Sequence, residues 1–185
     1  VAVTEWNTTA GDWNLGRGTL QTLSNALACS RYQNLMHRNA GLVELAIRSN
    51  LVDSFGSGVI QPGPGWFYLA PTYFAQELYQ RAAGSYPLRI DRESTKPWHE
   101  QAIDLSATLS DDGKTLRLYA VNSSAEPVAV AFCLEGFASR IAEASQTILR
   151  DRDDLVTAEV MNSRDDPLRI APQTNDLDIS GEEFS

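Results

Sequence analysis

One carboxylate near the start of the chain could take part in catalysis. Glu5 follows residues 1–4, an apolar run that predicts a β-strand, and it precedes Trp6 and Asn7. Catalytic groups of α/β barrels lie where a strand ends and the next loop begins. A carboxylate beside an aromatic ring and an amide is also typical of sugar-binding sites. Glu5, Trp6 and Asn7 are therefore candidate site residues, and the competing interpretation of Glu5 is a solvated carboxylate at a strand end.

The remaining reactive side chains form no pattern typical of catalysis or metal binding. Cys29 and Cys133 provide no disulfide framework, and His37 and His99 lie far apart without a cysteine at zinc-ligand spacing. We therefore expect no metal site. Aspartate pairs occur in turn-like sequence, where solvated side chains are the ordinary outcome. These pairs are residues 111–112, 153–154 and 165–166.

The composition excludes several classes of function. The chain has 185 residues, of which 43% are hydrophobic and 21% charged, as in a globular protein rather than a disordered one. Its 15 basic and 24 acidic residues give a net charge of −9, so the basic surface typical of nucleic-acid or anionic-membrane binding is not expected. No apolar run approaches the ~18 residues that a membrane-spanning helix needs. We expect neither nucleic acid nor membrane as a partner.

Residues 1–84 alternate strand-like and helix-like patterns. This order predicts two consecutive βα units with parallel strands, because a helix between two strands of one sheet forms a crossover connection. The longest predicted helix covers about residues 18–39, and its apolar stripe consists of Leu20, Leu23, Leu27, Tyr32 and Leu35. The other predicted elements are a strand at 1–4, a short helical stretch at 42–48, strand segments at 51–54 and 58–61, a loop at 62–65 and a helix at 73–81.

The second half of the chain changes to a pattern of short strands and turns. Residues 103–109 and 115–121 alternate apolar and polar side chains on either side of a hairpin turn. Further strands are predicted at 127–134 and 139–149, and no closing hydrophobic strand is predicted in the acidic, turn-rich sequence after residue 151. Short strands at this spacing favour an antiparallel β-sandwich.

The segment Thr4-Glu5-Trp6-Asn7 resembles the region around the catalytic nucleophile of glycoside hydrolase family 51, the α-L-arabinofuranosidases. Further segments are similar to that family in the same order, over about residues 1–175. They are Arg38-Asn39-Ala40 and Ser49-Asn50-Leu51-Val52-Asp53-Ser54 for a helix and the eighth strand of the barrel, Ser57-Gly58-Val59-Ile60-Gln61 for a strand end with a substrate-contacting Gln, Leu69-Ala70-Pro71-Thr72-Tyr73 for the last barrel helix, and residues 103–121 for the first hairpin of the C-terminal sandwich.

The resemblance implies a fold of two parts, α/β followed by all-β. Residues 1–84 are expected to be the last two βα units of a (β/α)₈ TIM barrel, and residues 85–185 an antiparallel, jelly-roll-like β-sandwich. A whole barrel needs roughly 200 residues or more, and the Asn-Glu motif that carries the family's acid/base is absent from the sequence. We therefore expect a truncated chain that is inactive alone and depends on the missing part of the barrel or on a partner chain.

The resemblance also implies a role for each candidate residue. Glu5 is expected to be the nucleophile of a retaining glycosidase, and Gln61, Trp6, Asn7 and Trp66 are expected to bind substrate. Buried packing is an alternative for both tryptophans. The implied substrates are terminal α-L-arabinofuranosyl groups of arabinan, arabinoxylan or their oligosaccharides, and no cofactor is implied.

Two other functions stay open at the level of sequence. One is a related retaining glycosidase of the same clan that acts on β-glucan or xylan, because a Glu-Trp-Asn segment does not specify the sugar. The other is a non-catalytic carbohydrate-binding sandwich, which predicts exposed aromatic side chains on the sandwich. Few aromatic residues follow Trp98, namely Tyr119, Phe132, Phe137 and Phe184, and their pattern favours the core. The sequence decides neither cytoplasmic nor secreted localisation, and the oligomeric state, a homo-oligomer included, is left open.

Overall fold

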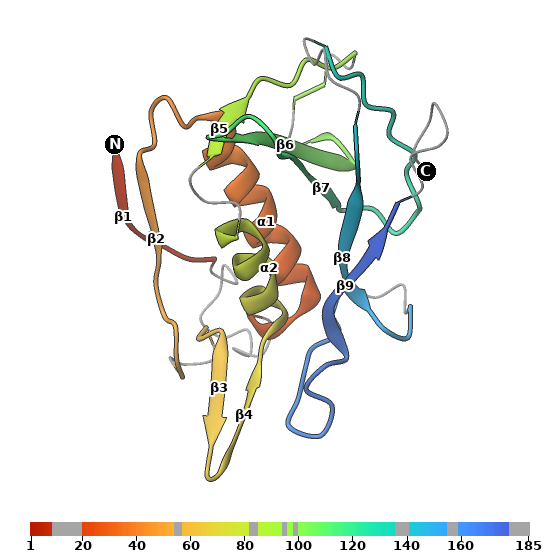
Figure 1. Ribbon diagram of the computed structural model, residues 1–185. Coiled ribbons are helices and arrows are strands. Elements are labelled where there is room, and N and C mark those ends of the chain that lie inside the picture. The colour runs from red at the N-terminus through yellow and green to blue at the C-terminus, as the bar shows by residue number, and fades with distance from the viewer. Residues whose placement is uncertain are drawn as a thin grey trace.

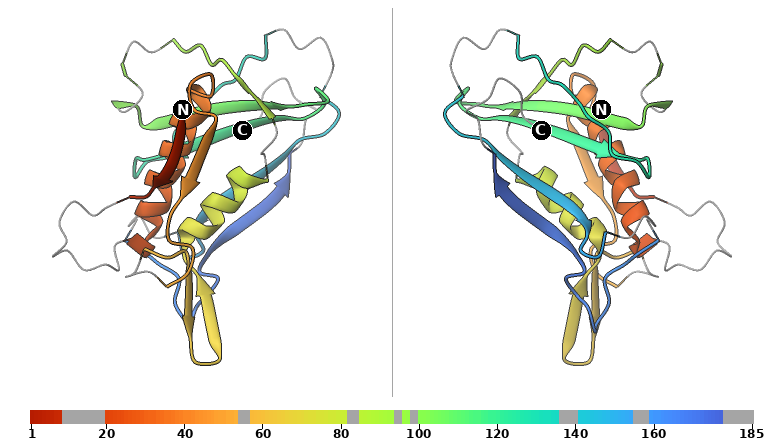
Figure 2. Two further views of the ribbon diagram at one scale, coloured as in Figure 1. Left: turned by 90° about the vertical axis from the view of Figure 1, so that its left-hand side faces the viewer. Right: turned by 90° about the vertical axis from the view of Figure 1, so that its right-hand side faces the viewer.

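The computed structural model describes residues 1–8, 20–53, 57–81, 85–93, 96–97, 100–135, 141–154 and 159–177. His99 and the predicted domain boundary at residue 84 lie outside the described residues. Figure 1 shows two helices in the middle of the molecule, with one strand pair on their left and the C-terminal strands above and to their right. Figure 2 shows from two further sides that one hairpin projects away from the rest of the chain.

The N-terminal strands form a parallel βαβ unit. Strand β1 (Ala2–Trp6) pairs with β2 (Leu45–Arg48), and helix α1 (Leu23–Arg38) lies between them in the sequence. Thr22 caps the start of α1, because its hydroxyl accepts a hydrogen bond from the amide of Asn25. The predicted helical stretch at 42–48 is therefore wrong. Such a short apolar segment fits both periodicities, and its pairing with β1 decides for the strand.

The buried face of α1 is polar rather than apolar. The predicted stripe is not the core face, since Tyr32 and Leu35 are 38% and 46% exposed. The helix instead buries small or polar residues, namely Asn25, Ala26, Cys29, Ser30, Gln33 and Asn34. Their partners lie on elements distant in sequence, so the periodicity of α1 alone could not identify this face.

The second α/β segment contains a hairpin and a helix. Strands β3 (Ile60–Gly63) and β4 (Trp66–Leu69) are antiparallel, and helix α2 (Pro71–Gln80) follows. The turn is shorter than the predicted loop, because Pro62 and Gly63 belong to β3 and Gly65 adopts a φ of 76°. The strand predicted at 51–54 is reduced, within the described residues, to a single bridge between Val52 and Ile60. The predicted helix is confirmed and begins two residues earlier, with Pro71 in its first turn.

Two antiparallel sheets make up the C-terminal part. Strands β5 (Ser85–Leu88), β6 (Ile103–Ser110) and β7 (Leu116–Asn122) form one sheet. Strands β8 (Ser145–Asp151) and β9 (Ile170–Asp176) form the other, and the arrangement is consistent with a β-sandwich.

The predictions for this part hold unevenly. The hairpin of β6 and β7 is confirmed, whereas residues 127–134 form no strand. Strand β9, which the sequence does not predict, pairs with β8 along its length. Most of β9 is polar and exposed, so it lacks the apolar alternation that identifies a strand from sequence.

A buried polar cluster joins α1 to β6. The carboxylate of Asp104 accepts from both terminal nitrogens of Arg38 at 2.9 and 3.1 Å and from the amide of Asn34 at 2.8 Å. The side-chain oxygen of Asn34 accepts from the hydroxyls of Ser106 and Tyr79, both at 2.7 Å. Because Asn34 has no exposed surface and all four of its hydrogen-bonding positions are used, this cluster fixes α1 against the sheet.

Candidate active site

Glu5 lies on a β-bulge at the carboxyl end of β1. Val3 pairs with Ala46 and Trp6 pairs with Arg48, so Thr4 and Glu5 together oppose the single residue between those partners. Bulges are concentrated next to active sites, where the extra residue redirects a side chain. The side chain of Glu5 is exposed. The structure therefore presents this carboxylate to the outside of the βαβ unit.

Trp6 lies on the opposite side of β1 from Glu5. It is 6% exposed, and its ring centroid lies 5.0 Å from that of Tyr32 on α1. Because Glu5 is exposed whereas Trp6 is buried against α1, Glu5 points away from the helix that Trp6 contacts. In this position Trp6 packs the strand against the helix, and its contact with substrate stays a prediction.

Asn7 is held by hydrogen bonds within the chain. Its side-chain oxygen accepts from the backbone amide of Thr8 at 2.9 Å and from the guanidinium of Arg48 at 3.1 Å. Its amide nitrogen lies 3.5 Å from the carbonyl of Ser49, a long and weak hydrogen bond. The amide nitrogen is therefore the part of Asn7 that is left to donate to a ligand.

Gln61 and Trp66 lie on one face of the β3–β4 hairpin. Gln61 pairs directly with Tyr68, and Trp66 pairs with Gly63. Residues at these alternate positions share a face, and the rings of Trp66 and Tyr68 are stacked with centroids 6.2 Å apart. A Cβ atom at Gly63 would lie 2.1 Å from the ring of Trp66, so only glycine allows this approach. The hairpin thus brings two of the predicted residues together.

Sequence reasoning missed Tyr68 and Arg48. Alternation along β4 could have grouped Tyr68 with Trp66, but the pairing of Arg48 depends on the register between β1 and β2. The Tyr68 hydroxyl donates to the side-chain oxygen of Gln21 at 2.8 Å, and partial burial raises its pKa. Gln61 donates to the carbonyl of Gly58 in the loop before β3. Both polar groups of the hairpin face are therefore oriented by neighbouring residues.

Cys29 on α1 is buried near the segment that follows β1, and it is not suited to act as a nucleophile. Its sulfur lies 3.9 Å from the hydroxyl of Thr8, and burial raises the pKa of the thiol. A protonated thiol is a poor nucleophile. Among the described residues near the carboxyl end of β1, Glu5 is the group with the chemistry of a nucleophile.

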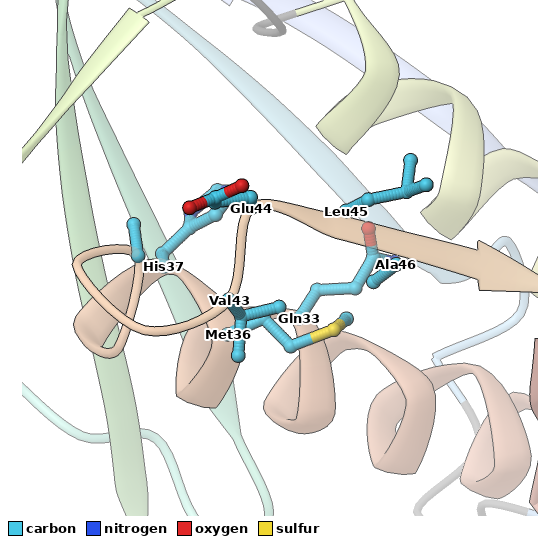
Figure 3. Close-up of a pocket in the computed structure, with 8 residues that line it drawn as sticks. Gln33, Met36, His37, Val43, Glu44, Leu45 and Ala46 are labelled. Atoms are coloured by element: carbon cyan, nitrogen blue, oxygen red, sulfur yellow. The ribbon is translucent and has the colours of Figure 1, made fainter. Parts of the chain in front are cut away.

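A shallow groove of about 170 Å³ lies between α1 and β2 (Figure 3). Gln33, Met36 and His37 line it from α1, and Val43 and Ala46 line it from the other side. It lies on the helix side of the strand pair, whereas Glu5 points to the other side. We therefore interpret this groove as a gap in helix–strand packing that is separate from the candidate site.

Neither a metal cluster nor a membrane span is found in the described part of the chain. No group of three or more His, Cys, Asp or Glu residues among the described residues is placed to hold a metal ion. No helix there is long and apolar enough to cross a membrane.

The fold and the site together define a class of protein. A parallel βαβ unit exposes a carboxylate at its carboxyl edge, and antiparallel sheets follow it in the chain. Residues 4–185 match the sequence model of the alpha-L-arabinofuranosidase C-terminal domain. The chain belongs to this family, which is a family of glycoside hydrolases, and the resemblance to family 51 is thereby confirmed. A comparison with curated proteins gives no match.

Solved structures of arabinofuranosidases, among them enzymes of family 51, share the fold. The alpha-L-arabinofuranosidase from Thermotoga petrophila RKU-1 has a TM-score of 0.74 and 20% identity over 99% of this chain and 40% of its own. The enzyme from Thermotoga maritima, an arabinose complex, has a TM-score of 0.71 and 20% identity over 95% and 38%. The arabinofuranosidase from Xanthomonas axonopodis pv. citri has a TM-score of 0.69 and 21% identity over 88% and 33%. This chain therefore spans a third to two fifths of these solved chains.

Proposed function

We propose that this chain supplies the nucleophile half of a retaining α-L-arabinofuranosidase site. The observation that carries the proposal is the exposed Glu5 on a bulge at the carboxyl edge of a parallel strand pair, in a member of this family. The proposed substrates are terminal α-L-arabinofuranosyl groups on arabinan, arabinoxylan or their oligosaccharides. The arabinose complex of the Thermotoga maritima enzyme supports the sugar class.

The proposed domains are a barrel part at residues 1–84 and a β-sandwich at residues 85–185. The βαβ unit formed by β1, α1 and β2 supports the barrel part. Leu45 and Ile47, on one face of β2, are 49% and 48% exposed. In a barrel, further βα units cover such a face and pair with the free strand edges. The remaining units would lie on the same polypeptide or on a partner chain. We call the protein that contains all of them the full-length protein.

The proposed mechanism has two steps. The Glu5 carboxylate attacks the anomeric carbon, an ester bond forms, and the bond to the leaving-group oxygen breaks. A second carboxylic acid about 5–5.5 Å away protonates that oxygen and then activates the water that cleaves the ester. The sequence contains no Asn-Glu dipeptide, so the acid/base is assigned to the rest of the barrel.

The hairpin face and Asn7 are assigned to substrate binding. Gln61 has a donor and an acceptor for sugar hydroxyls, the amide nitrogen of Asn7 can donate, and Trp66 offers an aromatic surface. We assign Trp6 to the support of the nucleophile strand beneath the sugar. In the full-length protein, Gln61→Ala is expected to lower kcat/KM. The decrease should correspond to a loss of about 0.5–1.5 kcal/mol in transition-state stabilisation. An unchanged kcat/KM on an aryl arabinofuranoside would remove Gln61 from the site.

A mechanism-based label tests the nucleophile directly. An arabinofuranose-configured carbocyclic aziridine reacts only when a carboxylate attacks its anomeric-equivalent carbon. The carbon–nitrogen bond then opens, and the nitrogen takes up a proton. Peptide mass spectrometry of the full-length protein is expected to find the ester on Glu5, and Glu5→Gln is expected to abolish it. The exposed Glu44, directly before β2, is the matched control, and Glu44→Gln is expected to label at the wild-type rate. An ester on a residue other than Glu5 would contradict the proposal.

A further inference from the structure

Arg48 collects polar groups from three segments at the edge that carries Glu5. Its guanidinium donates to the side-chain oxygen of Asn7 at 3.1 Å. It also donates to the carbonyls of Ser49 and Asn50, at 3.2 and 3.4 Å, and to the carbonyl of Ser57 at 3.4 Å. These oxygens belong to the end of β1, the end of β2 and the loop that leads into β3. One side chain therefore connects the ends of β1 and β2 with the loop that leads into β3.

The described residues at the two ends of the loop after β2 contact this guanidinium. Asn50 adopts a φ of 66°, and its side-chain amide donates to the hydroxyl of Ser57 at 3.0 Å. The amide of Ser49 donates to the carbonyl of Trp6 at 3.0 Å, which continues the contact of β2 with β1. The ends of this loop are thus held to each other, to Arg48 and to the residue that follows Glu5.

The acceptors of Arg48 indicate a geometric role. All four are neutral oxygens, whereas Arg38 on α1 donates twice to the carboxylate of Asp104. A planar guanidinium can donate in several fixed directions at once, and a lysine ammonium on a flexible stem cannot reproduce that fork. If the hydrogen bonds of Arg48 matter, a lysine is not an adequate replacement.

We propose that Arg48 is a positioning residue for the nucleophile: it fixes Asn7 and the two described ends of the loop after β2, at Asn50 and Ser57, and through them the bulge that carries Glu5. This inference rests on the proposed function of Glu5. Small displacements of a reacting group cost large factors in rate, about 100-fold for 1 Å. Loss of Arg48 is therefore expected to slow attack by Glu5 more than it weakens sugar binding, because Asn7 is only one of the proposed sugar contacts.

The test compares four proteins by their rates of labelling with the aziridine. In the full-length protein, Arg48→Met and Arg48→Lys are both expected to lower the maximal labelling rate about 10- to 100-fold, with the half-saturating concentration changed less than about threefold. Arg38→Met is the structural control, because Arg38 stabilises the fold away from this edge. It is expected to lower Tm at least as much as the Arg48 variants and to label at the wild-type rate in the folded protein. Arg89→Met, at an exposed position, replaces this control if Arg38→Met does not fold.

The outcomes separate this inference from the proposed function. Slow labelling in both Arg48 variants supports the positioning role. A full rate in either Arg48 variant overturns it, because Arg48→Lys keeps the charge and loses only the fork of hydrogen bonds. If wild-type protein acquires no label on Glu5, the proposed function fails, and the role of Arg48 fails with it.

Discussion

The two sides of α1 differ in how completely the neighbouring elements pair their polar groups and cover their apolar side chains. On one side, Asn34 and Arg38 make hydrogen bonds to Asp104 that leave no donor of Asn34 unused. On the other side, β1 and β2 pair only with each other among the described strands, and Leu45 and Ile47 are about half exposed. The first side is a buried contact in which the polar groups are paired. The second is an apolar strand pair without cover.

This difference teaches how the parts depend on one another. Buried polar clusters tolerate little change, because a partner left alone keeps its desolvation cost. An exposed apolar face and two free strand edges are instead typical of surfaces that another element covers. The sheet of β5, β6 and β7 is therefore fixed to α1 within this chain, and we expect the pair of β1 and β2 to need further βα units.

The largest expected effect comes from breaking the polar cluster. Asp104→Ala leaves the guanidinium of Arg38, 14% exposed, without its carboxylate and should lower the free energy of unfolding by about 3–5 kcal/mol. Asp91→Ala is the matched control, because the Arg89–Asp91 pair is exposed and should contribute about 0–1 kcal/mol. Urea unfolding measures both variants. Equal losses would show that the cluster is no more important than a surface ion pair.

A smaller effect is expected on the uncovered face. Ile47→Thr in this chain alone should change the free energy of unfolding by less than about 0.5 kcal/mol, because the side chain is 48% exposed. In the full-length protein the same hydroxyl would be buried among covering units and should cost about 1–3 kcal/mol. Unfolding of the two proteins side by side gives the comparison. The same small change in both would mean that nothing covers this face.

The smallest and most gradual effect is expected from pH. Burial, together with the positive charge of Arg38, lowers the pKa of His37 below its ordinary value of 6.5. The folded protein then binds fewer protons than the unfolded one between the two pKa values, so its stability falls as the pH decreases below about 6.5. His37→Gln, which can still donate to Ser106, should flatten this dependence. Tm measured from pH 8 to pH 5 tests it, and parallel curves for the two proteins would rule out His37 as the cause.

Local patterns predicted some elements of the fold and not others. The hairpin of β6 and β7 follows from alternation and an Asp-Gly turn, which act over a few residues. The buried face of α1 could not be predicted, because Asp104 and Ser106, about 70 residues away, determine which side is polar. Strand β9 could not be predicted, because it is mostly polar and its strand conformation depends on pairing with β8.

The candidate site divides in the same way. Position after an apolar run and family resemblance were enough to select Glu5. The bulge beneath Glu5 and the role of Arg48 depend on the register between β1 and β2, which the sequence does not specify. Tyr68 lies between these cases, since alternation along β4 groups it with Trp66 but the sequence predicts no strand there.

The central claim, that Glu5 is the nucleophile, is tested most directly by chemical rescue of Glu5→Ala in the full-length protein. The variant should fold normally, because an exposed carboxylate contributes little to packing, and it should lose several orders of magnitude in turnover, on the scale seen when a nucleophile is removed. Azide in the vacated space can then attack the anomeric carbon of an activated aryl α-L-arabinofuranoside, the aryloxide leaves, and a glycosyl azide forms. The account predicts the inverted β-configured azide. Retained configuration, or hydrolysis by Glu5→Ala at nearly the wild-type rate, would contradict it.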